Sequence, residues 1–413
     1  MNRLCLLVVA LLCVCIHTSS AQQGWLVQNP FPAGTSLWGV QFVPNDTHVG
    51  TIVGEDGSML RTTDDGASWI IVNSATNNDL YGVSFTNTLA GTVVGESGSI
   101  LRTTDGGTTW INQASGFGEN LYGVRFGDDN TGIAVGEAGA ILRTTDAGSN
   151  WSATDTVQRK RLYAIVKPDV NNWITVGDSG TIRRSTDDGI SWTTITSNTL
   201  HDLFAVSFAT ANIGTIVGEA GTILRTTNGG EDWVKQSGGS DAWLFGVCFT
   251  DAATGTAVGN GGTILRTTDG GATWTSQASG TTSALWGVSF TSANTGTIVG
   301  DDGAVLSTTT GGVVSSVRNI INNASNEHAV LQQSFPNPAS DITTFRFEVV
   351  QQGHVVIDLI DALGSNIAII ISEHMQQGSY EATFDTRNVP VGMYHCRMHV
   401  GGIVASKRLV VVR

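Results

Sequence analysis

Hydrophobic residues recur along most of the chain in short runs that follow one another in a fixed order. From residue 80 onward there are four such runs, at residues 80–85, 91–95, 99–104 and 109–113, separated by polar or glycine-rich turns. Short runs rich in β-branched and aromatic residues predict β-strands, and the tight turn at residues 96–98 predicts a hairpin. The same order returns every 41 residues. Four strands in a repeat of this length predict one blade of a β-propeller.

Two positions of the repeat indicate how many blades there are and how the ring closes. A leucine begins the first run seven times, at Leu37, Leu80, Leu121, Leu162, Leu203, Leu244 and Leu285. The fourth run contains a tryptophan only six times, at Trp69, Trp110, Trp151, Trp192, Trp233 and Trp274. The seventh copy lacks it, whereas Trp25–Gln28 resembles Trp110–Gln113 and has no copy of its own. We therefore expect an all-β, seven-bladed propeller over residues 22–315, in which the N-terminal strand completes the last blade and removes open sheet edges.

Both ends of the chain depart from the repeat. Arg3, the apolar run 4–16 and the small residues 19–21 predict a signal peptide at residues 1–21, because the run is shorter than the roughly 20 residues of a membrane span. No later segment is apolar enough to cross a membrane. Residues 316–333 are polar and irregular and predict a linker. In residues 334–413, β runs about ten residues apart predict a small β-sandwich. These runs are residues 343–349, 354–364, 379–386, 392–400 and 406–413.

Composition narrows the classes of partner and of chemistry. The net charge is −14, which argues against nucleic acid as a partner, because binding to a polyanion needs a basic surface. Three of the five cysteines lie in the predicted signal peptide, which leaves Cys248 and Cys396 in different predicted domains. We therefore expect no disulfide, and the sequence predicts neither a metal site nor a cofactor.

The phrase that ends in each repeated tryptophan resembles a known motif. Thr103-Thr104-Asp105-Gly106-Gly107-Thr108-Thr109-Trp110 and its counterparts resemble the Asp-box, or bacterial neuraminidase repeat. Together with the preceding VGxxGxILRTT stretch, the spacing is closest to the propeller family of photosystem II assembly and stability factors. This resemblance covers about residues 25–315 and implies a propeller that binds a protein partner.

The C-terminal domain resembles a second family. Phe335-Pro336-Asn337-Pro338, the run around Asp361 and Gly364, and the terminal Lys407–Val411 are similar to the C-terminal sorting domain of type IX secretion substrates. The resemblance implies that residues 334–413 engage the type IX secretion machinery. It also implies that the mature protein is secreted or reaches the outer cell surface.

Repeated arginines form the first group of candidate binding residues. They occupy one position of the repeat, at Arg61, Arg102, Arg143, Arg184, Arg225 and Arg266. The turn residue six positions earlier is acidic in each of these copies except the sixth, which has Asn260. In one interpretation the arginines pair between neighbouring blades. In the other they ring one face and bind an acidic or C-terminal peptide, because a guanidinium matches a carboxylate well.

The fourth copy forms a second group, because it departs most from the repeat. It carries Arg159, Lys160, Arg161, Lys167, Arg183 and Arg184 within 26 positions of an acidic chain. Lys167 stands where other copies have phenylalanine, and Trp173 stands where they have glycine. Sequence drift and a local patch for an anionic partner both account for this pattern.

Three functions are compatible with the sequence. We favour a secreted, non-catalytic propeller that acts as a protein- or ligand-binding or assembly module. A sialidase-like surface glycoside hydrolase is the first alternative, but it needs an arginine cluster, a tyrosine nucleophile and a glutamate at one site. The tyrosines Tyr81, Tyr122 and Tyr163 instead share one aromatic position of the repeat. A photosystem II assembly factor is the second alternative, against which the sorting domain argues.

Overall fold

The computed structural model describes residues 24–28, 34–44, 46–155, 159–312, 329–349, 352–361, 366–400 and 403–413. The predicted signal peptide and most of the predicted linker lie outside these ranges. The chain divides into two compact units, one up to Val317 and one from Arg318. Within the described ranges, regular structure consists of β-strands and three-residue 3-10 helices.

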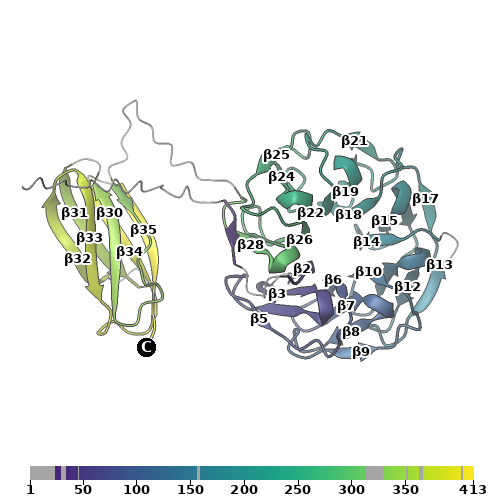
Figure 1. Ribbon diagram of the computed structural model, residues 1–413, viewed down its shortest axis with the longest axis horizontal. Helices are drawn as coiled ribbons and strands as arrows, with labels where there is room; N and C mark the ends of the chain where they lie inside the picture. The colour runs from purple at the N-terminus through teal and green to yellow at the C-terminus, as the bar shows by residue number, and fades with distance from the viewer. Residues whose placement is uncertain are drawn as a thin grey trace, which may run out of the picture. The chain divides into compact units, whose positions relative to one another are not determined.

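The first unit is a propeller of seven four-stranded antiparallel sheets (Figure 1). The inner strands are β2 (Leu37–Val43), β6 (Leu80–Phe85), β10 (Leu121–Phe126), β14 (Leu162–Val166), β18 (Leu203–Phe208), β22 (Leu244–Phe249) and β26 (Leu285–Phe290). Each inner strand contacts the next, and β26 contacts β2, so the ring is closed. The predicted number of blades is confirmed.

The remaining strands of each blade follow outward from the centre. The second strands are β3 (Asp46–Gly54), β7 (Gly91–Gly95), β11 (Gly132–Gly136), β15 (Trp173–Gly177), β19 (Gly214–Gly218), β23 (Gly255–Gly259) and β27 (Gly296–Gly300). The third strands are β4 (Met59–Thr62), β8 (Ile100–Thr103), β12 (Ile141–Thr144), β16 (Thr181–Ser185), β20 (Ile223–Thr226), β24 (Ile264–Thr267) and β28 (Val305–Thr308). The outer strands are β5 (Ile70–Ile71), β9 (Ile111–Gln113), β13 (Ser152–Asp155), β17 (Thr193–Ile195), β21 (Val234–Gln236), β25 (Thr275–Gln277) and β1 (Leu26–Val27).

Short helices join the second and third strands at one end of every blade. They are η1 (Glu55–Gly57), η2 (Glu96–Gly98), η3 (Glu137–Gly139), η4 (Asp178–Gly180), η5 (Glu219–Gly221), η6 (Asn260–Gly262) and η7 (Asp301–Gly303). We call the side of the propeller that carries them the helical-turn face. The Asp-box turns, which join the third and outer strands, lie at the opposite end of the blades, on the box face.

The Asp-box turn is held by its own side chains. In the second blade, Asp105 accepts hydrogen bonds from the Thr103 hydroxyl at 2.8 Å and from the Thr109 amide at 2.9 Å. Gly107 has a positive φ of 80°, which suits glycine, and its amide donates to the Thr103 hydroxyl at 2.9 Å. Trp110 is buried and meets the Phe85 ring edge-on, with the ring centroids 6.0 Å apart. Equivalent hydrogen bonds occur in the other five complete boxes, so the box is a structural clamp in six blades.

The N-terminal segment supplies the tryptophan that the seventh box lacks. In β1, Leu26 pairs with Ser307 and Val27 with Leu306 of β28. Trp25 is fully buried, and its indole N–H donates to the Gln277 side-chain oxygen at 2.9 Å. Its ring meets Phe290 edge-on at 5.9 Å, as Trp110 meets Phe85. The predicted closure through the N-terminal strand is confirmed.

The hydrophobic core of the propeller lies between neighbouring blades. One cluster joins Val53 and Met59 of the first blade to Leu80, Phe85 and other residues of the second, all almost fully buried. Equivalent clusters join other neighbouring blades. Because each blade buries its faces against two others, an open ring would expose a whole apolar face.

The second unit is a small β-sandwich, as predicted. One sheet contains β29 (Ala329–Leu331), β30 (Ile342–Val349) and β33 (Gly378–Asp385), and the other contains β32 (Asn366–Met375), β31 (Gly353–Ile360), β34 (Gly392–Val400) and β35 (Ile403–Val411). Phe345, Ile357 and Met398 belong to the core that both sheets share. Two strands lie outside the predicted runs, since β32 was not expected and β29 falls within the predicted linker. β29 is ordered because it pairs with the edge of β30.

Candidate functional site

Three of the repeated arginines link their blade to the Asp-box turn of the next blade. The Nε atom of Arg61 donates to the Gly106 carbonyl oxygen at 2.6 Å, and that of Arg184 donates to the Gly229 carbonyl oxygen at 3.0 Å. Arg143 donates from Nε to the Asp188 carbonyl oxygen at 2.9 Å and from Nη2 to its carboxylate at 3.0 Å. These guanidiniums therefore fasten neighbouring blades together.

The other three arginines reach the next blade through an aromatic ring. Arg102, Arg225 and Arg266 each donate to a threonine of their own second strand. Their guanidiniums lie over the inner-strand phenylalanine of the next blade, 5.0 to 5.4 Å from the ring centroid. Arg102 and Arg266 are buried. All six arginines thus have partners across a blade boundary, which fits the interpretation that they pair between blades.

The seventh blade has Ser307 at the arginine position, and the N-terminal segment supplies the missing link. The Gln28 side-chain nitrogen donates to the Gly66 carbonyl oxygen of the first Asp-box turn at 2.8 Å. The amide of Gln28 also donates to Val305 of β28 at 2.8 Å. Gln28 therefore fastens the last blade to the first where no arginine is present.

Blade four replaces a conserved pair of residue types within the repeat. In the other six blades the inner-strand phenylalanine lies over a glycine of the second strand, and a Cβ added there would meet the ring at 2.5 to 2.9 Å. In blade four these positions are Lys167 and Trp173. Trp173 is fully buried, and the Lys167 ammonium lies 4.8 Å from its ring centroid. An aromatic ring therefore enters the same region from the second strand instead of the first.

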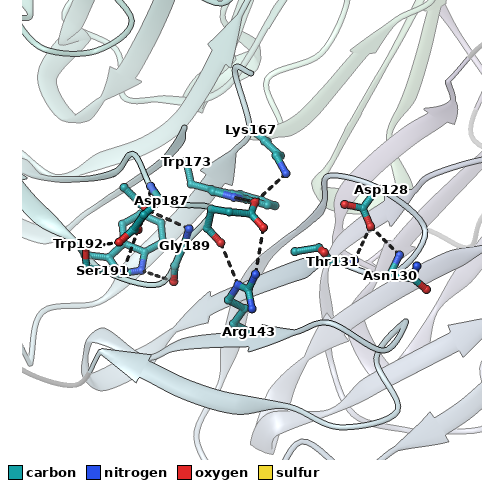
Figure 2. A network of polar contacts seen from close by, with 12 residues as sticks. Asp128, Asn130, Thr131, Arg143, Lys167, Trp173, Asp187, Gly189, Ser191 and Trp192 are labelled. Atoms are coloured by element: carbon teal, nitrogen blue, oxygen red, sulfur yellow. Dashed lines mark hydrogen bonds and ion pairs between the residues drawn. The ribbon is translucent and has the colours of Figure 1, made fainter. Parts of the chain in front are cut away.

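Lys167, Trp173 and Arg143 all donate hydrogen bonds to Asp188, a residue of the fourth Asp-box turn. Figure 2 shows these three donor side chains close to one another. One carboxylate oxygen accepts from the Lys167 ammonium at 2.8 Å and from the Trp173 indole at 3.0 Å. The other accepts from Arg143 at 3.0 Å. Burial tends to raise the pKa of Asp188, but these donors outweigh it and lower the pKa below its ordinary value. Asp188 is therefore a charged centre that holds Lys167 in place.

The remaining basic residues of blade four do not gather around Lys167. Arg159 and Lys160 are exposed, and Arg161 pairs with Glu137 at 3.4 Å, all on the helical-turn side of β14. Arg183 is 5% exposed and donates to the Trp192 carbonyl oxygen at 3.2 Å. The six predicted residues therefore occupy several environments, and only Lys167 lines a cleft on the box face.

That cleft contains an arginine that the sequence analysis did not single out. Arg125 lies in β10, at a position where other blades have Ser84, Ser207 or another uncharged residue. The serine hydroxyl accepts a hydrogen bond from the next inner strand, for example from the Phe126 amide to Ser84 at 3.1 Å. Arginine has no acceptor to offer at this position. The sequence does contain a signal for this site, because Arg125 is the charged residue among the seven residues at this repeat position. A single substitution of this kind is easily overlooked.

Arg125 has no counter-ion in the part of the chain that the structure describes. Its Nε atom is buried without a hydrogen-bond partner, and burial alone lowers the pKa of its guanidinium. The cleft has a volume of about 390 Å³ and is lined by Arg125, Lys167 and the acidic residues Asp128, Asp169 and Asp188. Asp128 and Asp169 each accept backbone amides of their own loops, and Asp188 is bound to Lys167. Arg125 therefore remains the cation available to a ligand.

The described residues lack a metal-binding cluster, a membrane-spanning helix and a disulfide. No group of three histidine, cysteine or acidic side chains in these ranges is arranged to hold a metal ion. None of the helices described there has the length and apolar character needed to span a membrane. Cys248 and Cys396 are both free.

Comparison with known proteins identifies relatives of both units. The family model described as photosynthesis system II assembly factor YCF48 matches residues 18–111 and 67–200. The secretion system C-terminal sorting domain matches residues 333–412. No curated protein matches the sequence.

Solved structures show the same propeller fold. YCF48 from Cyanidioschyzon merolae is 22% identical, with a TM-score of 0.59 over 69% of this chain and 98% of that one. A YCF48 bound to a D1 peptide is also 22% identical, with a TM-score of 0.60 over 70% and 97%. The GH74 enzyme of Niastella koreensis is 12% identical, with a TM-score of 0.58 over 95% and 75%.

The two family matches cover different units of the chain, and the YCF48 structures match the propeller along almost their whole length. The chain is thus an Asp-box β-propeller that resembles the photosystem II assembly factor family, followed by a type IX secretion C-terminal sorting domain.

Proposed function

We propose that this protein is a non-catalytic binding module that acts outside the cell, and that its ligand presents an anionic group to Arg125. The sorting domain supports export to the outer surface or secretion. The observation that carries the binding proposal is the unpaired Arg125 guanidinium in the blade-four cleft. Its Nε atom is buried without a hydrogen-bond partner, which is costly, so a bound carboxylate or phosphate would stabilise the half-buried guanidinium.

The cleft also has the form of a specific site. Lys167 and Arg143 are fixed by Asp188, so their positions do not depend on a ligand. Arg125 and Lys167 each occur in a single blade, so they define one site per propeller. The repeated arginines occur in six blades and would define six similar sites. A preformed site lowers the conformational entropy lost on binding.

A sialidase-like hydrolase is the alternative that the tyrosines favour. Tyr122 donates to Glu137 at 2.8 Å and Tyr163 donates to Asp178 at 2.6 Å, which are pairs of a nucleophile and a carboxylate. These pairs lie on the helical-turn face. The repeated arginines lie three or more residues further along the blades, toward the box face, and contact the next blade. An arginine clamp beside a tyrosine nucleophile therefore has no support from this arrangement.

A role like that of YCF48 is the second alternative. One structural neighbour binds a D1 peptide, which supports a peptide as a class of ligand for this fold. Export by a type IX tail would take this protein away from a photosynthetic membrane. We therefore carry over the binding of a peptide but not the photosynthetic partner.

The proposal is tested with the mature chain, residues 22–413, and two kinds of probe. A fluorescein-labelled hexaglutamate peptide should bind, and the Arg125→Gln variant should lose that binding, whereas Arg159→Gln, an exposed charge-matched control, should keep it. A panel of fluorogenic glycosides should show no turnover. Turnover that a single substitution such as Tyr122→Phe abolishes would establish the hydrolase instead, and equal binding by both arginine variants would remove Arg125 from the site.

A further inference from the structure

The helical-turn face carries seven aromatic side chains that the proposed function does not use. They occupy the second position of each inner strand and are Trp38, Tyr81, Tyr122, Tyr163, Phe204, Phe245 and Trp286. In every blade the strand register shifts across this position, as between Leu80 and Gly82. A bulge of this kind removes a residue from the ladder and turns its side chain away from the sheet.

These side chains form a ring around the centre of the propeller, which we call the aromatic collar. Six of the seven neighbouring pairs have ring centroids 4.1 to 5.6 Å apart, ending with Phe245 stacked on Trp286. All seven are partly exposed. Trp243 is 44% exposed and contacts Phe204 and Phe245 from outside the collar. So large a cluster of partly exposed aromatic rings is typical of a contact surface.

Carboxylates surround the collar at fixed positions. The first residue of each short helix is acidic in six blades, at Glu55, Glu96, Glu137, Asp178, Glu219 and Asp301. Asp301 accepts the Trp286 indole N–H at 2.8 Å, and Glu137 and Asp178 accept the Tyr122 and Tyr163 hydroxyls. Others accept backbone amides, as Glu55 accepts that of Ser36 at 2.9 Å. The carboxylates are therefore held beside the rings.

Most of the charged side chains that contact the collar are carboxylates. Burial and the carboxylates nearby raise the pKa of Tyr81 and Tyr163, which reflects a site that disfavours further negative charge. Arg161 is the cation nearest to Tyr122 and Tyr163, and Glu137 pairs with it. On the opposite side of the ring, Phe245, Trp286 and Asp301 have no such cation among the ion pairs of the described residues.

We propose that the aromatic collar binds a cationic side chain, an arginine or lysine presented by a peptide or protein loop, on the side formed by Phe245, Trp286 and Asp301. A cation is attracted to aromatic faces, and a neighbouring carboxylate adds a direct ionic contact. This inference deepens the proposed binding function, because it gives the propeller a second site, for the opposite charge, on the other face. A partner that carries both charges could then be distinguished from a simple polyanion.

The test uses the eleven tryptophans of the mature chain, labelled with ¹⁵N, as reporters. The indole signals of Trp38, Trp243 and Trp286 report on the collar, and the other eight serve as internal controls. The probe is a capped Gly-Gly-Arg-Gly-Gly peptide, and its counterpart carries citrulline, which has the shape of arginine without the charge. We expect saturable shifts of the collar signals with the arginine peptide and none with the citrulline peptide.

Two variants locate the site. Phe245→Leu should weaken binding of the arginine peptide by about 2- to 30-fold, the range of a cation–π contact. Asp301→Asn should also weaken it, whereas Asp269→Asn, the same charge change in an Asp-box turn, should not. The citrulline comparison needs no variant and so does not depend on whether the variants fold.

Each other outcome has a definite meaning. Equal shifts with both peptides, or no shift at all, would overturn the collar proposal. Shifts with cellohexaose but not with the arginine peptide would overturn it in favour of a glycan site. Hexaglutamate binding in the same sample separates the two proposals: if it persists while the collar is silent, only the collar inference fails.

Discussion

Single residues from distant parts of the chain complete the repeat. Trp25 stands in the seventh blade where the other Asp-box turns have their own tryptophan, and Gln28 spans the boundary that lacks an arginine. The Asp-box turn needs an indole packed against the inner-strand phenylalanine of its blade. The indole can come from any part of the chain that reaches this position, because packing depends on position in space and not on order in the sequence. This is why a strand at one end of the chain can complete a blade at the other.

Replacing Trp25 should show how much stability the closure carries. Trp25→Ala should lower the free energy of unfolding by about 3–5 kcal/mol, since it empties a fully buried site. Leu26→Ala, in the same strand but 58% exposed, should change it by less than about 0.5 kcal/mol. Urea unfolding followed by tryptophan fluorescence reports on the propeller alone, because all eleven tryptophans lie in that unit. Equal losses in both variants would contradict the account of closure.

The Asp-box carboxylates should give the stability a characteristic acid dependence. The hydroxyl and amide of Thr109, and then the Thr103 hydroxyl, lower the pKa of Asp105 from 3.8 to about 2. Because the pKa is lower in the folded state, the contribution is complete above 3.8 and is lost as the pH falls toward 2. The melting temperature of the parent should therefore exceed that of Asp105→Asn by a constant amount near neutral pH, and the difference should shrink below about pH 4. A difference that persists at pH 2 would exclude this origin.

The sequence allowed only part of the site to be predicted at the residue scale. Lys167 and Trp173 could be recognised in the sequence as departures from the repeat. Only the structure shows that the two positions face each other, so that Trp173 fills the space that the phenylalanine ring fills in other blades.

Arg125 is a single substitution at one repeat position in one blade. Among the described residues it lacks a counter-ion because the nearby carboxylates of Asp128 and Asp169 accept backbone amides of their own loops, which the sequence does not reveal. Arg183 looked like a patch residue, yet β16 places it in a buried position.

Strands within a blade accommodate such exchanges in pairs. The phenylalanine ring of six blades lies where any side chain larger than glycine on the second strand would collide with it. Blade four carries the ring on β15, as Trp173, and has Lys167 directly after β14 where the other blades have phenylalanine. The unit of variation is therefore the pair of facing positions and not the single residue.

A double-mutant cycle tests this pairing. Trp173→Gly alone should destabilise the propeller by about 3–5 kcal/mol by leaving a cavity, and Lys167→Phe alone should crowd the Trp173 ring and cost about 1–3 kcal/mol. The double variant restores the pair found in the other blades and should be less destabilised than the sum of the two. Urea unfolding of the four proteins gives the coupling energy. Additive losses would show that the two positions do not compensate each other.

Boundaries between blades should depend on the repeated arginines. Arg266→Ala removes hydrogen bonds to Thr256 and to the next blade together with the contact over Phe290, so we expect a loss of about 1.5–3 kcal/mol. Arg159→Ala, at an exposed position, should change stability by less than about 0.5 kcal/mol. Unfolding midpoints in urea provide the comparison. If Arg159 proved the more important residue, the arginines would not be the links between blades.

The strands of the propeller could be predicted from the sequence because the same pattern of residues occurs in every blade. Seven copies of the leucine position and six of the tryptophan position predicted the blades and the closing strand. In the second unit each strand occurs once, so β32 and the short β29 had no repeated pattern to indicate them. β29 in particular depends on a tertiary pairing with β30, which local sequence does not encode.

At the scale of the whole molecule, two units with different tasks follow one another along the chain. Periodicity predicted the propeller, and ordered motifs up to the last residue predicted the sorting domain, so both fold types could be inferred in advance. The ligand could not, because it depends on which charges remain unpaired after folding. Arg125 lies in a cleft on the box face, and a collar of aromatic rings with neighbouring carboxylates lies on the helical-turn face.

We infer that the sorting domain carries a self-contained binding propeller to the outside of the cell. The most direct measurement is the location of the full chain and of a chain ending at residue 333 in a host with type IX secretion. We predict that the full chain reaches the medium or outer surface, and that the shortened chain stays in the periplasm with an unchanged unfolding midpoint. Arrival of the shortened chain outside the cell, or loss of its folded propeller, would contradict the account.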